Sequence, residues 1–387
     1  MSTTNPATSI TNLPSLTDMK DKFMNIIKNL DEEYQTYLVL MIIIIIVLIY
    51  LSSLSYISSL KTKDCDYMNN LYPDIDGYIV PISDSNIDAQ FKLFDYYIKT
   101  AYNACSGGNY KNSYVDVCNL KAVIKQGVRC LDFEIYSLEN EPIVSTSTEK
   151  SFYVKETFNS VAFSSVMSII NSHAFASGTC PNPTDPLLIH LRIKSNNQLI
   201  FTRMAEIFSN YDKMLGYDYS YIYTGENLGQ LPIIKFKSKI IVIVENSNKA
   251  FMENEKFLEY VNITSNGIFM RAYNFYDIKN NPDINEITDY NKSNMTIVLP
   301  DKGMNPGNPN GMVCRTYGCQ LVAMRYQEVD NFLKENTSFF DRGAAAFVLK
   351  PKELRYEPII IPDPPEQNPA LSFETRTEGN QYFTYEI

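Results

Sequence analysis

The residues best placed to do chemistry are charged side chains inside two apolar segments. The segment 130–136, Cys-Leu-Asp-Phe-Glu-Ile-Tyr, would as a β-strand send Asp132 and Glu134 to one face. In a second apolar segment, His190 and Arg192 share a face in the same way. Carboxylates ligate cations or pair with a guanidinium, and a histidine transfers protons. Because His190 lies two residues before Arg192 on the same face of an apolar segment, we interpret it as a core histidine with satisfied hydrogen bonds rather than as a catalyst.

Cysteine usage argues against a zinc site. The chain has 7 cysteines, all after residue 60, and none forms a Cys-x-x-Cys pair. Disulfides are compatible with the polar surroundings of five of them, which are Cys65, Cys105, Cys118, Cys180 and Cys314. Cys130 and Cys319 lie in apolar segments, and we expect them to be buried thiols.

The net charge of −10 and the pI of about 4.9 exclude some classes of partner. A nucleic-acid-binding protein presents a basic face, so we expect no nucleic acid partner. Broad electrostatic adhesion to anionic lipid is also not expected.

Short apolar segments alternate with helical patterns over residues 87–352. Strands are predicted at 128–136, 187–194, 239–244, 320–326 and 344–349, and helices at 119–126, 157–172 and 197–209. This alternation favours a parallel sheet covered by helices. About 265 residues is near the size of one α/β barrel.

One segment is long and apolar enough to cross a membrane. Residues 34–60 contain no charged residue, and about 20 apolar residues span a bilayer core. A cleaved signal peptide would lie nearer the start, and a buried core helix would rarely carry five consecutive isoleucines. Flanking lysines are nearly balanced, so we expect a cytoplasmic N-terminus and a barrel outside or in a lumen mainly from the position of the segment. Sequons at Asn262, Asn291 and Asn336 fit that side.

The flanking regions differ in character from the apolar core of the chain. Residues 1–33 are rich in polar side chains and are predicted to be disordered, with one short helix around 16–30. Residues 61–87 are predicted to form a polar connector. Residues 356–387 are rich in proline and aromatic residues and are predicted to form an extended tail.

Two sets of segments carry a resemblance to a known family. The first set is 94–103, 124–136 and Glu-Pro-Ile-Val at 141–144. The second is 290–300, 317–327 and the Leu-Lys-Pro-x-x-Leu-Arg pattern at 349–355. In order and spacing they resemble the X and Y halves of the catalytic barrel of eukaryotic phosphoinositide-specific phospholipase C. The resemblance covers residues 88–355 and implies an α/β fold of the distorted TIM-barrel type, here preceded by one transmembrane helix.

The resemblance implies a phosphodiesterase site that depends on two histidines and calcium. The first family histidine stands in a His-Asn pair, and here the pair is Tyr102-Asn103. The second follows Glu-Pro-Ile-Val by two positions, where this chain has Thr146. A tyrosine with an ordinary pKa of about 10 is a poor base at neutral pH, and threonine has no acid–base function there. The catalytic groups are therefore expected to be missing.

The family's calcium site is also altered. Asn103, Asp132 and Glu134 match three of its ligand positions, but Arg192 stands at the fourth, acidic position. A guanidinium cannot ligate calcium, so we expect Arg192 to lie against the two carboxylates in place of the cation.

The family's phosphate contacts are reduced as well. Lysine positions correspond to Ile243 and Glu245, and an arginine position corresponds to Ile297.

These losses predict a single-pass, membrane-anchored barrel that is not catalytic and binds an inositol phospholipid head group or a protein. We expect no metal and no cofactor in that case, because the altered positions remove the family's ligands. Two alternatives stay open. One is an active phosphoinositide phospholipase C, which would need calcium, and the other is a structural or adhesive membrane protein. The Asn-, Ile- and Tyr-rich composition is typical of an AT-rich genome, such as that of a large DNA virus or a protist.

Overall fold

The computed structural model describes residues 16–28, 31–85, 87–151, 153–357, 362–363, 365 and 373–387. Two helices precede the main domain, α1 (Leu16–Lys28) and α2 (Glu32–Leu71). The first of them agrees with the short helix predicted around 16–30. The disorder predicted for residues 1–15 lies outside the described residues.

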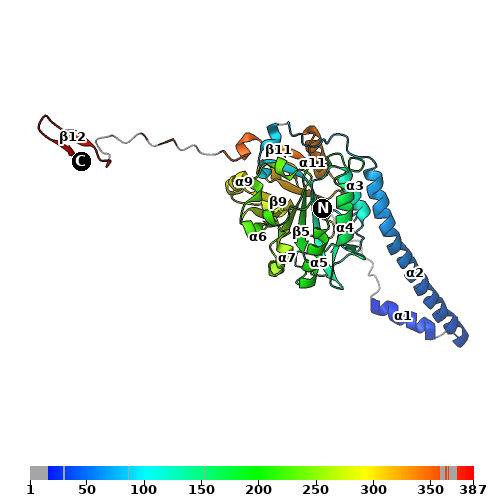
Figure 1. Ribbon diagram of the computed structural model, residues 1–387. Helices are drawn as coiled ribbons and strands as arrows, with labels where there is room; N and C mark the ends of the chain where they lie inside the picture. The colour runs from blue at the N-terminus through cyan, green and yellow to red at the C-terminus, as the bar shows by residue number, and fades with distance from the viewer. Residues whose placement is uncertain are drawn as a thin grey trace, which may run out of the picture.

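The main domain is an α/β barrel built on a mostly parallel sheet (Figure 1). Its strands are β1 (Tyr96–Ala101), β2 (Cys130–Leu138), β5 (Leu187–Ile193), β6 (Ile240–Glu245), β7 (Ile263–Ser265), β8 (Met270–Asn274), β9 (Met295–Leu299) and β10 (Leu321–Met324). They pair in the order β7-β6-β5-β2-β1-β10-β9-β8. The two ends of this path, β7 and β8, are joined through residues 266–269, so the sheet is a nearly closed ring. The predicted distorted TIM-type fold is confirmed.

Alternation along the strands divides the apolar side chains into two layers. Leu131, Phe133 and Ile135 of β2 belong to a cluster shared with residues of the covering helices. Side chains that point to the inner face of the sheet, such as Cys130 of β2 and Ile243 of β6, belong to a second cluster inside the ring. The longer covering helices are α3 (Val117–Lys125), α4 (Phe163–His173), α5 (Gln198–Ser209), α9 (Ile284–Ser293) and α11 (Asn331–Arg342). Shorter ones are α6 (Tyr221–Thr224), α7 (Glu255–Leu258), α8 (Phe275–Lys279) and α10 (Gly311–Thr316).

Three short strands depart from the parallel order. Strands β3 (Glu141–Ser145) and β4 (Val161–Ala162) extend β2 as an antiparallel hairpin. Strand β11 (Phe347–Leu349), predicted as one more strand at 344–349, pairs antiparallel with β1. The C-terminal residues of β1 already pair with β10 and β2. Strand β11 therefore pairs with the N-terminal residues of β1, Tyr96–Ile98.

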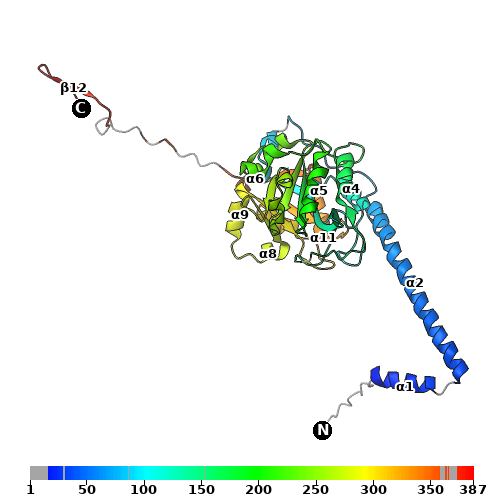
Figure 2. The same cartoon turned by 60° about the horizontal axis from the view of Figure 1, so that its bottom comes forward.

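The apolar segment and the first part of the expected connector form one helix. Helix α2 runs on past residue 60 to Leu71, because residues 61–71 dock against α3. Cys65 forms a disulfide with Cys118, the Lys61 ammonium lies 3.3 Å from an Asp116 carboxylate oxygen, and Met68 is fully buried. Figure 2 shows α2 projecting from the barrel as a single straight element.

The end of the chain is not an extended tail throughout. Strands β12 (Thr377–Gly379) and β13 (Thr384–Glu386) form a small hairpin whose side chains are all exposed. The Asn380 side-chain oxygen closes its turn by accepting from the backbone amides of Tyr382 and Phe383.

Candidate functional site

The charged residues identified in the sequence lie inside the barrel near the carboxyl ends of its strands. Asp132 and Glu134 of β2 and Arg192 of β5 have the parity that points into the ring. The β2–β5 register places Asp132 beside His190 and Glu134 beside Arg192. The two carboxylates have no exposed surface and Arg192 is 2 % exposed. This end of the barrel, where residues 102–116, 146–151, 153–160 and 300–310 form loops, is called the mouth below.

The Arg192 guanidinium lies between the two carboxylates. Its Nε and Nη2 donate to the two oxygens of Asp132 at 2.9 and 2.6 Å, and its Nη1 donates to Glu134 Oε1 at 2.5 Å. Nη2 also donates to Asn103 Oδ1 at 3.0 Å. One cation therefore contacts the side-chain oxygens of Asp132, Glu134 and Asn103, in the forked geometry that guanidinium favours.

Tyr102 and Asn103 close the site from the end of β1. The Arg192 guanidinium carbon lies 4.6 Å from the centre of the Tyr102 ring, a cation–π contact. Asn103 adopts a left-handed backbone conformation, with φ of 45°, and its backbone amide donates to an Asp132 oxygen at 3.1 Å. The Asn103 side-chain nitrogen is buried with no hydrogen-bond partner among the described residues.

Glu134 has further partners that the sequence did not indicate. Lys302 Nζ lies 2.5 Å from Glu134 Oε1, although the two residues are far apart in the chain. The other oxygen, Oε2, accepts from the Tyr136 hydroxyl at 2.8 Å and from the Ser147 amide at 2.9 Å. Lys302 lies just after β9, in a loop whose sequence has no helical or strand pattern. The only sequence feature that could have indicated its role is its position after the end of a strand.

Burial and charge act in opposite directions on the two carboxylates. Burial disfavours their ionised forms, but the Arg192 charge and the hydrogen bonds from His190 and Arg192 together outweigh it and hold the pKa of Asp132 well below its ordinary range. The charges of Arg192 and Lys302 together lower the pKa of Glu134 to about 2. Both residues are therefore ionised at neutral pH, as partners of fixed cations.

His190 is held on both sides of its ring. One ring nitrogen lies 2.7 Å from Asp132 Oδ1 and the other lies 2.8 Å from the Ser265 hydroxyl. The side chain has no exposed surface. This agrees with the interpretation of His190 as a core histidine, because neither nitrogen is left to meet a substrate.

The other predicted positions lie outside this network. The Thr146 hydroxyl donates to the Tyr110 carbonyl at 3.0 Å. Ile243 and Ile297 are buried in the apolar cluster inside the ring, where they present no group to an anion. Glu245 is 7 % exposed at the end of β6, and the Asn266 side chain donates to it at 3.4 Å.

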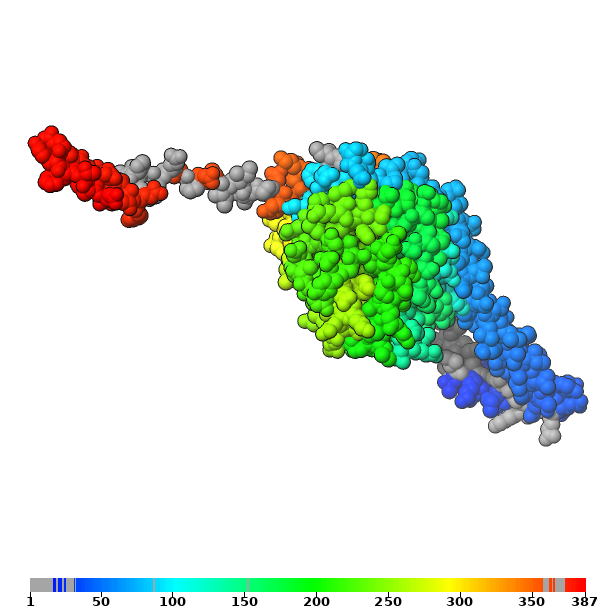
Figure 3. Space-filling view, viewed as in Figure 1, coloured from blue at the N-terminus to red at the C-terminus, as the bar shows by residue number. Residues whose placement is uncertain are grey.

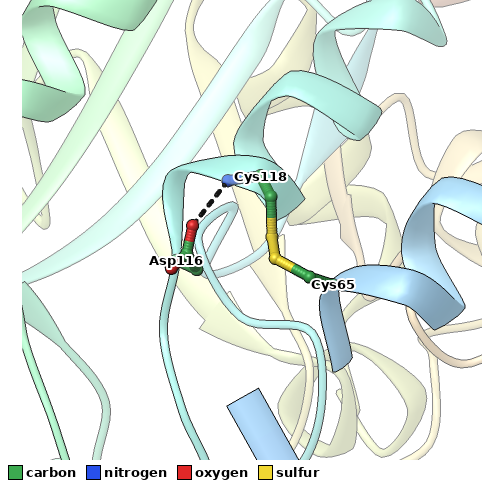
Figure 4. A group of neighbouring side chains, drawn as sticks. All are labelled: Cys65, Asp116 and Cys118. Atoms are coloured by element: carbon green, nitrogen blue, oxygen red, sulfur yellow. Dashed lines mark hydrogen bonds between the residues drawn. A yellow bond between two sulfur atoms is a disulfide. The ribbon is translucent and has the colours of Figure 1, made fainter. Parts of the chain in front are cut away.

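Among the described residues, one group of three side chains of the types that bind metals comes close together. Cys65, Asp116 and Cys118 place a ligand atom each within 4.8 Å of one another. Figure 4 shows the two sulfurs bonded to each other, with Asp116 accepting from the Cys118 amide. The thiols are consumed by the disulfide, so this group serves the helix joint rather than a metal.

We predict an acid-sensitive contribution of Glu134 to stability. Because its folded pKa is about 2 and its ordinary value is 4.5, its stabilising effect is full above pH 4.5 and is lost as the pH falls towards 2. The shift corresponds to about 3 kcal/mol. Urea unfolding of the protein and of Glu134→Gln across this range should give free energies that converge on acidification. A difference that stays constant with pH would contradict the prediction.

Comparisons with known proteins agree with the fold. The family model for the X domain of phosphatidylinositol-specific phospholipase C matches residues 90–246, and the model for its Y domain matches residues 238–353. No curated protein matches the chain.

Solved structures of low identity share the barrel. The crystal structure of L. pealei PLC21 is 20 % identical with a TM-score of 0.55, and that of S. officinalis PLC21 is 19 % identical with the same score. Each alignment covers 69 % of this chain and 38 % of the other. The chain thus spans about two fifths of the length of either PLC21 chain.

Proposed function

Because this chain belongs to the phosphatidylinositol-specific phospholipase C family through its X and Y domains, we propose that it is a membrane-anchored, non-catalytic member of that family. Its barrel would bind an inositol phospholipid head group, or a protein, without cleaving it. The observation that carries this proposal is the Arg192 guanidinium lying between Asp132, Glu134 and Asn103.

The residues present do not fit calcium. The ion takes six to eight oxygen ligands at 2.3–2.6 Å, whereas here Arg192 donors lie 2.5–3.0 Å from the oxygens at the three matching positions. Lys302 adds a second positive charge on Glu134. A calcium ion would have to displace a buried guanidinium and then approach another cation, so no reaction step is assigned to it.

Acid–base groups are also lacking at the two positions that match the family's catalytic histidines. Tyr102 and Thr146 stand where the family has histidines, and burial raises the pKa of Tyr102 well above its ordinary value. A tyrosine in that state cannot take a proton near neutral pH. His190 contacts Asp132 and Ser265 and is fully buried, so it supplies no replacement.

Helix α2 supports the anchor. Residues Glu33–Leu71 include a window long and apolar enough to cross a membrane, and none of that window is buried against the protein. The Cys65–Cys118 disulfide favours a barrel on an oxidising side, outside the cell or in a lumen. The three sequon asparagines give no further support, because Asn262, Asn291 and Asn336 are buried at 1 % exposure or less.

The main competing function is phosphodiester hydrolysis, and a turnover measurement separates the two. We expect the full chain in phosphatidylinositol vesicles with calcium to release no inositol phosphate above the protein-free rate, since each lost acid–base group removes about 10²–10⁴ in rate. Turnover that disappears in His190→Ala would overturn the proposal. Inositol phosphates that bind the full chain in detergent would support the head-group ligand, whereas their failure to bind would leave a protein as the ligand of the barrel.

A further inference from the structure

The direction of α2 along the barrel is fixed by its contacts with α3. Helix α3 follows β1, so it begins at the mouth and descends to the opposite end, where β2 starts. Lys61 and Cys65 contact the beginning of α3 at Asp116 and Cys118. Further along, the Pro73 carbonyl accepts from Lys125 Nζ at 2.9 Å at the end of α3. Helix α2 therefore passes the mouth first and the far end of the barrel second.

The apolar part of α2 consequently leaves the barrel on the mouth side. Residue 60, the last of the apolar segment, is five residues before Cys65, which at 1.5 Å per residue is about 8 Å along the helix axis. Figure 3 shows this part of α2 standing clear of the barrel. A membrane around residues 34–60 would lie next to the mouth.

The joint between helix and barrel leaves no flexible linker. Besides the disulfide and the Lys61–Asp116 pair, the Ser113 hydroxyl donates to an Asp64 oxygen at 2.8 Å, and the Tyr72 hydroxyl donates to the Tyr326 carbonyl at 2.7 Å. The helix is continuous from Glu32 to Leu71. Since neither the helix nor its docking site has a break, the angle between span and barrel is set by packing.

Apolar side chains are exposed on the loops of the mouth, and one of these loops is hydrogen-bonded to the segment that contacts α2. On the loop after β3, Tyr153 is 50 %, Val154 74 % and Phe158 42 % exposed. The Phe158 amide donates to the carbonyl of Ser113, the residue that contacts Asp64 of α2. Met304 of the neighbouring loop is 50 % exposed. These four residues are called the mouth rim.

We propose that α2 holds the barrel in one fixed orientation relative to the membrane, with the mouth rim in contact with the lipid leaflet from which the helix emerges. This rests on the anchor in the proposed function and names its partner as the lipid of the chain's own membrane. The barrel then meets ligands that lie in that leaflet. A soluble protein is an alternative occupant of the rim, and the test below distinguishes it.

The absence of tryptophan from the chain permits a direct test. Val154→Trp places a single reporter on the mouth rim, and Val80→Trp places a matched one at the opposite end of the barrel, where Val80 is 53 % exposed and its amide donates to Ala344. In nanodiscs containing brominated lipids we expect a blue-shifted, quenched emission from Val154→Trp and neither effect from Val80→Trp. Equal, unquenched emission from both would overturn the proposal and would leave the rim for a soluble partner.

A second variant tests whether the helix sets the orientation of the barrel relative to the membrane. A Gly-Ser linker inserted between Leu60 and Lys61 separates the span from the docked part of α2 without touching the joint. The Val154→Trp signal should lose its quenching in that background, and full retention would overturn the role given to the helix. Failure of the unmodified chain to enter nanodiscs would instead count against the anchor, so the two proposals fail in different ways.

Discussion

Replacing Arg192 by methionine is expected to lower the free energy of unfolding by about 3–5 kcal/mol at neutral pH, since the change leaves the buried Asp132 carboxylate without its cation and Glu134 with Lys302 alone. Asp132 and Glu134 have no exposed surface, so water cannot compensate for the lost charge. For a domain of this size the thermal midpoint should fall by roughly 10 °C. Differential scanning calorimetry of the full chain in detergent measures the shift.

Two further variants separate charge from packing. Arg203→Met removes an arginine that also lies near two carboxylates but is about half exposed, and we expect no measurable change in the midpoint. Adding Asp132→Asn to Arg192→Met removes the unpaired carboxylate charge while the Glu134–Lys302 pair stays, and should restore much of the loss. A double variant no more stable than Arg192→Met would assign the loss to packing, and an unchanged midpoint in Arg192→Met would refute the ionic role.

The centre of the site could be predicted from the sequence because it rests on strand alternation. Asp132, Glu134 and Arg192 lie on two strands that are neighbours in the barrel, and their parity alone places them on the inner face. The contact expected between Arg192 and the two carboxylates is present in the structure. The family resemblance was also needed, because it places Arg192 at the fourth ligand position and so beside the two carboxylates.

Partners that come from loops could not be predicted in this way. Lys302 and Ser147 reach Glu134 from segments that have no repeating pattern, and their approach depends on how the barrel closes. The Cys65–Cys118 disulfide was also beyond the sequence, because it requires α2 to stay helical through the polar residues 61–71. Tertiary docking on α3, rather than local hydropathy, stabilises that extension.

The fold was predictable to the level of its class. Strands with continuous apolar character indicated a covered parallel sheet, and the structure has one. The antiparallel pairing of β11 was not indicated, since it follows from which parts of β1 are already paired. Pairing of this kind is a property of the whole sheet, so no local pattern reports it.

Restoring an acidic residue at position 192 should make the barrel sensitive to calcium. In Arg192→Glu three carboxylates and the Asn103 amide oxygen would face one another, and without a cation their mutual repulsion should destabilise the barrel more than Arg192→Met does. Lys302 still neutralises Glu134 in this variant, so its positive charge opposes an incoming ion. We therefore expect the larger response from Arg192→Glu combined with Lys302→Met.

Calcium binding to the folded state would then appear as stabilisation. At a concentration about 100 times its dissociation constant, an ion that binds only the folded chain adds about 2.7 kcal/mol, and thermal unfolding with and without calcium measures this gain. Magnesium is the matched control, because it demands a tighter octahedral shell and should stabilise less. The unmodified chain should show no response to calcium. Its Arg192 guanidinium already lies among the oxygens of Asp132, Glu134 and Asn103, the residues at the family's calcium-ligand positions. If calcium raised the midpoint of the unmodified chain, the ion would have to bind beside Arg192, and the argument that the guanidinium replaces it would fail.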